Sequence, residues 1–232
     1  MEWKKYYMDM MLVPLGLVII LAYHVLLCHK CRTQPFTTIM GRDADGRRFW
    51  VGAMMKDIDK KHIVAVHSLR NIIMGTTLMA TTSILLCAGL GAVISSSYSV
   101  KKSIDDSVYG ANGEVVVTLK YAIILTILSC SFFCHTLAAG FVNQVNILIC
   151  TPQDVKSMVT PEYLTEHMRK ATILNVVGNR LFYSALSLTL WIFGPVLPFL
   201  SSIVMVFVLY KLDFVPGKNS NNKVEDLIQN QV

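Results

Sequence analysis

Residues 71–100 read NIIMGTTLMATTSILLCAGLGAVISSSYSV, a run of 30 residues without Asp, Glu, Lys or Arg. A helix needs about 20 mostly apolar residues to cross the hydrocarbon of a bilayer. Continuous apolar runs of this length are typical of helices and not of the alternating strands of a membrane barrel. Similar runs elsewhere in the chain give four predicted spans, at residues 10–28, 72–97, 121–148 and 181–210.

Composition supports the same class of protein. Charged residues make up 16% of the 232 residues and hydrophobic residues 53%, whereas soluble domains carry about 25% charged residues. This excludes most soluble-enzyme interpretations. The length allows one membrane domain over residues 1–215, followed by a polar tail at 216–232 that is expected to be disordered.

The first span could be mistaken for a signal peptide, because Lys4 and Lys5 precede it. Its apolar run is longer than the 7–15 residues of a signal sequence, and no small-x-small cleavage site follows. It is therefore interpreted as an uncleaved anchor.

Charge asymmetry predicts the orientation. Four spans place both termini and the 101–120 loop on one side, and the loops at 29–70 and 154–180 on the other. The second set carries 13 of the 21 Lys and Arg residues. The positive-inside rule then places these two loops in the cytoplasm and both termini outside it. The organelle stays open, with the secretory pathway or plasma membrane favoured.

Both cytoplasmic loops contain helix signals. In the first loop, residues 49–69 show apolar positions at helical spacing opposite charged ones, which predicts an amphipathic helix whose apolar partner is either lipid or the third loop. Before it, Asp43 to Gly46 is interpreted as a surface turn. In the third loop, Thr151-Pro152 and Thr160-Pro161 are helix-start signals. The fold class is thus all-α: an integral membrane four-helix bundle with cytoplasmic amphipathic helices in these two loops.

Polar residues near the cytoplasmic ends of the spans form the candidate site. Membrane-embedded polar side chains are costly and often functional. Two interpretations stay open: hydrogen bonds that register neighbouring helices, or a polar vestibule that binds a ligand. The residues expected to converge are Arg70, Asn71, His135, Asn143, Gln144, Asn146, Asn179 and Arg180.

Cysteine and histidine offer two further hypotheses. Cys28 and Cys31 lie at the membrane boundary and are candidates for lipidation, or are free thiols in a reducing compartment. His24 and His135 are of a residue type that can ligate a haem iron, although a hydrogen bond from each to a neighbouring helix is the favoured interpretation. No metal site and no cofactor are predicted.

The last span contains Gly194-Pro195 and Pro198, which are expected to kink its helix near the middle. The sequence contains none of the phosphate-binding, zinc-protease or serine-hydrolase motifs. A non-enzymatic role is therefore expected.

As a set, several segments resemble a known family. The sequence is similar to the plant branch of the family called domain of unknown function 599, over about residues 10–215. The resemblance implies a multi-pass membrane protein of uncharacterised activity, and no catalytic residue can be carried over from it. It rests on Lys60–Lys61, Arg70–Asn71, Thr81–Leu90, Tyr98–Lys102, Ser131–His135, Asn143–Ile149, Gly178–Tyr183, Trp191–Pro195 and Leu209–Phe214.

Three functions follow as hypotheses. The first is a channel or transporter-like component, the second a scaffold or assembly subunit of a larger membrane complex, and the third, more remote, a haem-binding redox protein. The lipid bilayer is an expected partner, together with a second copy of the chain or another membrane protein. No nucleic-acid partner is expected.

Overall fold

A computed structural model of the chain describes residues 2–56, 58–99, 114–150 and 159–214. The described part is all-α, as predicted. Its elements are α1 (Glu2–Thr33), the 3-10 turn η1 (Pro35–Thr37), α2 (Ile39–Lys56), α3 (Ile58–Ser99), α4 (Glu114–Leu148), α5 (Pro161–Thr189), the 3-10 turn η2 (Leu190–Ile192) and α6 (Val196–Asp213). The 216–232 tail and the Thr151-Pro152 helix start lie outside the described residues.

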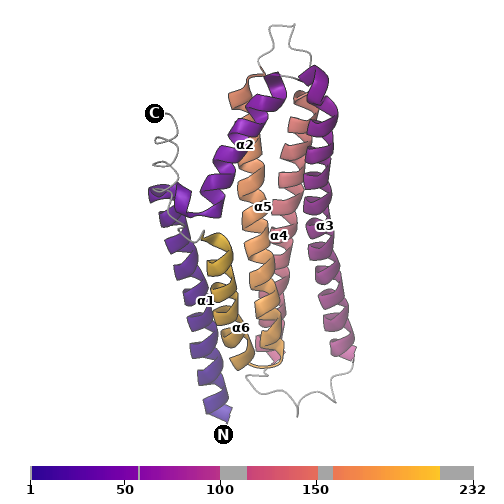
Figure 1. The fold of residues 1–232 in the computed structure, drawn as a ribbon. Helices are drawn as coiled ribbons and strands as arrows, with labels where there is room; N and C mark the ends of the chain where they lie inside the picture. The colour runs from indigo at the N-terminus through magenta and orange to yellow at the C-terminus, as the bar shows by residue number, and fades with distance from the viewer. Residues whose placement is uncertain (1, 57, 100–113, 151–158, 215–232) are drawn as a thin grey trace.

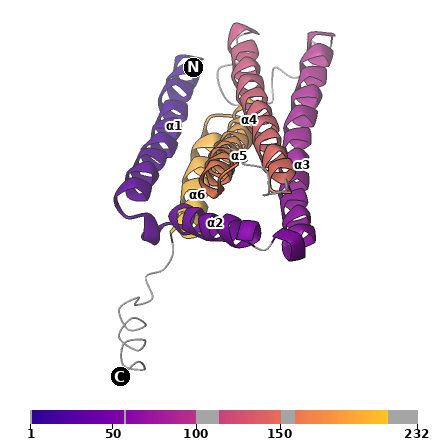
Figure 2. The same ribbon diagram turned by 90° about the horizontal axis from the view of Figure 1, so that it is seen from above.

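The long helices form two groups (Figures 1 and 2). In the first, α3, α4 and α5 lie side by side and alternate in direction, and they are called the three-helix core below. In the second, α1 and α6 run in the same direction, with Gly16 facing Ser202 and Leu27 packed with Leu209. Seen from above, α6 lies between α1 and α5 (Figure 2).

Four helices contain a segment long and apolar enough to cross a membrane. These segments are Asp9–Thr33 in α1, Lys60–Ser96 in α3, Val116–Leu148 in α4 and Val196–Asp213 in α6. The first three overlap the predicted spans at 10–28, 72–97 and 121–148.

The predicted fourth span, 181–210, is not one kinked helix but parts of two helices that run in opposite directions. The reversal occurs at Gly194, whose φ of 147° suits glycine because it has no Cβ. Pro195 follows and lacks a backbone N–H, so the α5 helix cannot continue through it. What the sequence analysis interpreted as a kink is a helical hairpin.

Because of this hairpin, α6 runs antiparallel to α5 and in the same direction as α1, and it lies beside only part of α5. Within the α1–α6 pair, the N-terminus of α1 and the C-terminus of α6 lie at opposite ends (Figure 1). The side of the membrane on which each terminus lies stays a prediction. At 29 residues, α5 is about 43 Å long, which is enough to run beside α4 through the whole bundle.

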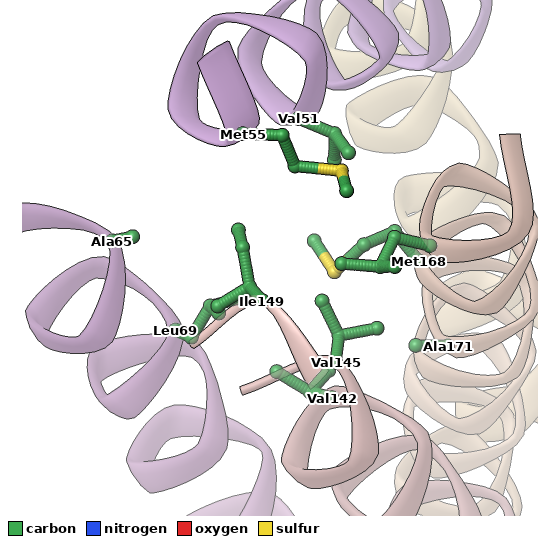
Figure 3. Packing of buried hydrophobic residues seen from close by; sticks show 10 residues of the cluster. Val51, Met55, Ala65, Leu69, Val142, Val145, Ile149, Met168 and Ala171 are labelled. Atoms are coloured by element: carbon green, nitrogen blue, oxygen red, sulfur yellow. The ribbon is translucent and has the colours of Figure 1, made fainter. Parts of the chain in front are cut away.

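Beyond the end of α6, a cap joins α2 to the upper parts of the three-helix core (Figure 3). In this cap, Val51 and Met55 of α2 pack against Leu164 and Met168 of α5. The helix predicted at 49–69 is divided between the end of α2 and the start of α3. The apolar face of its α2 part is covered by the third-loop helix, one of the two partners that the sequence left open. The cluster is completed by Ala65, Leu69, Val142, Val145, Ile149 and Ala171.

Two local features of the cap test the sequence signals. Thr160 is the N-cap of α5, and its side chain accepts a hydrogen bond from the Tyr163 backbone N–H at 3.2 Å, as the Thr-Pro signal predicts. The surface turn expected at Asp43 to Gly46 is instead part of α2. An Asp43–Arg47 pair one helical turn apart, at 4.0 Å, is compatible with this helix.

Candidate functional site

Three of the buried polar groups that connect the helices of the bundle contain an ionisable side chain. The first is called the N-end clamp and consists of Asp9 on α1, Lys120 on α4 and Trp191 on η2. Lys120 Nζ lies 3.3 Å from Asp9 Oδ2, and Trp191 Nε1 donates to Asp9 Oδ1 at 3.0 Å. The Lys120 ammonium is also 5.1 Å from the centre of the Trp191 ring. Lys120 and Asp9 are only 3% and 7% exposed, so the pair is shielded from solvent.

The second group, called the cap-end clamp, lies where α6 ends. Asp213 accepts hydrogen bonds from Arg180 Nη2 and from the Tyr23 hydroxyl, each at 2.5 Å. The three side chains come from α6, α5 and α1. Side chains on a helix point toward its N-terminus, so Arg180 on the descending α5 is aimed toward the cap end, where Asp213 lies.

The third group, the histidine network, lies inside the three-helix core. His135 is fully buried; its Nδ1 lies 2.8 Å from the Ser131 carbonyl and its Nε2 lies 3.1 Å from Asn179 Oδ1. Ser131 donates to the Gly178 carbonyl at 2.9 Å and is 3.3 Å from Ser83 on α3. The network thus links α3, α4 and α5 through side chains that include no carboxylate.

Gly178 makes this network sterically feasible. A Cβ at this position would lie 2.7 Å from His135 Cε1 and 2.8 Å from Nδ1. Atoms cannot approach so closely, so the imidazole ring can pack against the α5 backbone because residue 178 has no side chain. The sequence analysis noted Asn179 but missed its neighbour.

The eight predicted polar residues occupy different surroundings. His135 and Asn179 are hydrogen-bonded to one another, whereas Arg180 belongs to the cap-end clamp. Asn146 is partly buried, and its Oδ1 has no hydrogen-bond partner among the described residues. Consecutive helical residues point in directions about 100° apart. Residues at a similar height along the bundle can therefore face different neighbours. The remaining four are exposed: Arg70, Asn71, Asn143 and Gln144.

Sequence reasoning missed most of the two clamps. It did not single out Asp9, Tyr23, Lys120 or Asp213 as candidate site residues. A signal was available, because Asp9 and Lys120 directly adjoin an apolar run and Asp213 lies three residues beyond the end of one. An acid or base at such a boundary can be buried when another helix supplies its partner.

The candidate cysteines and histidines have different surroundings in the structure. All six cysteines are free; Cys28 is exposed, whereas Cys31 Sγ lies 3.6 Å from Thr38 Oγ1. His24 Nδ1 faces the Ile20 carbonyl at 2.7 Å, and both ring nitrogens of His135 face protein oxygens, so His135 presents no free nitrogen to an iron. Within residues 2–56, 58–99, 114–150 and 159–214, no three His, Cys, Asp or Glu side chains are grouped as metal ligands.

Comparison with other proteins identifies the family. No curated protein and no solved structure matches the chain. A family model does match it, over residues 11–217, which include every described helix beyond the first turns of α1 up to the end of α6. The chain therefore belongs to the family described as "Protein of unknown function, DUF599".

Proposed function

We propose that the chain is a five-pass, non-enzymatic component of a membrane carrier or channel. The observation that carries this proposal is the pair of buried charged clamps at opposite ends of the bundle. Ionisable side chains at membrane depth are expensive and mark functional sites by default. Breaking a buried ion pair costs about 3–5 kcal/mol because a charge is left without compensation.

The clamps connect the same two groups of helices. The N-end clamp joins α1 to α4 and η2, and the cap-end clamp joins α6 and α1 to α5. Release of one clamp, while the other stays closed, opens the contact between the α1–α6 pair and the three-helix core at one end only. Such motion gives alternating access, provided that a substrate or coupling ion compensates the released charge.

Five passes also change the proposed orientation. With the C-terminus at the cap end, 16 of the 21 Lys and Arg residues belong to segments on the cap side or to helices that lead into it. The positive-inside rule then places the cap and the C-terminus in the cytoplasm and the N-terminus outside it. The other five basic residues are Lys4, Lys5, Lys101, Lys102 and Lys120.

Tags at the two termini test the number of passes. In sealed membrane vesicles, protease added outside is expected to remove one tag and leave the other intact. Removal or protection of both tags would support four passes and contradict the five-pass arrangement. Vesicles opened with detergent serve as the control, because both tags must then be cleaved.

Ion flux tests the transport activity. Purified protein in vesicles is exposed in turn to H⁺, Na⁺, K⁺ and Cl⁻ gradients, and flux above that of protein-free vesicles is expected for one of them. Lys120→Met should lower this flux at least tenfold, whereas Glu166→Gln, which alters an exposed ion pair in the cap, should not. A flux that Lys120→Met leaves unchanged would contradict the proposed role of the clamps. The absence of flux under all four gradients would reject an ion path.

A scaffold or assembly role is the second candidate. The observation that favours it is the set of exposed polar side chains near the cap ends of α3 and α4, namely Arg70, Asn71, Asn143 and Gln144. These side chains are free to contact another membrane protein. Native mass spectrometry after gentle extraction from the original membrane would show a fixed-ratio complex with a foreign subunit if this role is correct, and the chain alone or with copies of itself if it is not.

A further inference from the structure

The corner where α1 passes through η1 into α2 is a compact, well-defined structure. The Gln34 backbone N–H donates to the Lys30 carbonyl at 2.8 Å, and Arg42 Nε donates to the Phe36 carbonyl at 2.9 Å. Thr38 is buried and forms an isolated bridge with Phe214, just beyond α6. The corner is therefore fixed against the end of α6 as well as against α1.

Exposed basic residues occupy the helix turns that meet at this corner. Lys30 and Arg32 lie in the last turn of α1, and Arg42 lies in the first turn of α2; all three are exposed. Lys211 in the last turn of α6 is exposed too. Among the described residues, none of these four side chains has a carboxylate partner.

Apolar side chains lie beside these charges. Phe36 is 66% exposed and Ile39 is 41% exposed, although neither belongs to an apolar segment that could cross a membrane. The segment of α1 that could cross ends at Thr33, so Phe36 and Ile39 are located next to the boundary of the hydrocarbon. Aromatic and basic residues together are typical of the membrane–water interface.

We propose that this corner binds the headgroup of an anionic phospholipid in the leaflet on the cap side. The guanidinium groups of Arg32 and Arg42 contact the phosphate, which planar guanidinium groups bind with two parallel hydrogen bonds. Phe36 and Ile39 pack against the upper part of the acyl chains. The inference rests on the membrane placement of the proposed function, but transport activity is not needed for it.

Native mass spectrometry of the full chain with phosphatidylglycerol or phosphatidylcholine tests the site. We expect phosphatidylglycerol to bind at least tenfold more tightly than phosphatidylcholine, because each Arg near the interface favours anionic lipid. The variant Arg32→Gln/Arg42→Gln should lose this preference. The matched control, Arg48→Gln/Lys56→Gln, removes the same charge from exposed positions farther along α2 and should keep it.

Several results would overturn the proposal. Equal binding of both lipids by the unaltered chain would do so without any variant, and so would equal loss in the two double variants, which would indicate general charge attraction. Binding of inorganic phosphate in detergent that competes fully with the lipid would point to a site for free phosphate. Failure of the terminal-tag experiment above would reject the five-pass arrangement, whereas loss of lipid preference alone leaves that arrangement intact.

Discussion

The three-helix core is joined internally by neutral groups, whereas its contact with the α1–α6 pair adds two ion pairs to neutral packing. Inside the three-helix core, the histidine network connects α3, α4 and α5 through hydroxyl, amide and imidazole groups. Between the core and the α1–α6 pair, the contacts include Asp9–Lys120 and Arg180–Asp213. We expect the second contact to open more readily than the core, because an entering ion can compensate the charges of its two ion pairs.

Removal of one clamp partner should have the largest effect on stability. Lys120→Met removes the buried ion pair between Lys120 and Asp9, and the free energy of unfolding should fall by about 3–5 kcal/mol. The double variant Lys120→Met/Asp9→Asn should recover most of this loss, since Asn still accepts the Trp191 hydrogen bond. Unfolding in detergent measures both. A double variant as unstable as the single one would show that charge compensation is not the reason for the pairing.

Crowding of the histidine network should come next. Gly178→Ala places a methyl group 2.7 Å from the His135 ring and should lower the free energy of unfolding by about 1–3 kcal/mol. Gly140→Ala on α4 is the control, because a Cβ there meets nothing within 4 Å. If the two variants are equally stable, the network is looser than the geometry indicates, and the contrast between the two groups of helices weakens.

Loss of single hydroxyl groups in the core should be milder. Ser131→Ala removes the hydrogen bond to the Gly178 carbonyl and should cost about 0.5–1.5 kcal/mol. Thr136→Ala is the comparison, since the Thr136 hydroxyl bonds only within its own helix and is exposed. A larger loss for Ser131→Ala than for Lys120→Met would reverse the order on which the comparison of the two regions depends.

The smallest effect concerns an ion pair outside both regions. The hydrogen bond from Arg169 lowers the pKa of Glu166 in the cap. Because a lowered pKa in the folded state favours the carboxylate, the pair contributes stability at neutral pH and loses it as the pH falls through the range in which Glu166 becomes protonated. Solvent screens this exposed pair, so the acid dependence of unfolding in Glu166→Gln should differ only slightly from that of the unaltered chain. A large difference would contradict the expected screening and would mean that this ion pair in the cap contributes substantially to the stability of the fold.

Local signals predicted the parts of the fold that depend on neighbouring residues in the chain. Uncharged runs indicated the apolar helices, and the Thr160-Pro161 start of α5 has the expected cap. The apolar spacing of Val51 and Met55 indicated a face that needs a partner, but not whether that partner is lipid or protein. The expected turn at Asp43 to Gly46 failed because Gly46 tolerates a helix whose position is set by contacts at its other end.

For the candidate site, the sequence identified single members and missed the pairings. His135, Asn179 and Arg180 were recognisable as polar residues within apolar surroundings. Asp9 could not be matched with Trp191, which lies 182 residues away, nor Tyr23 with Asp213, which lies 190 residues away. Such contacts depend on which helices become neighbours, and residue spacing along one helix contains no information about that.

The sequence by itself determined the class of this protein, because too few charges are present to cover a soluble globule and the apolar runs are long enough for membrane helices. Tertiary structure decided that α5 is a fifth helix through the bundle. Its Asn179 and Arg180 make it too polar to be recognised as a span, and it is accommodated because His135 and Asp213 on neighbouring helices satisfy those side chains. Hydropathy reports the cost of burying a polar group alone, whereas the fold removes much of that cost by supplying its partner.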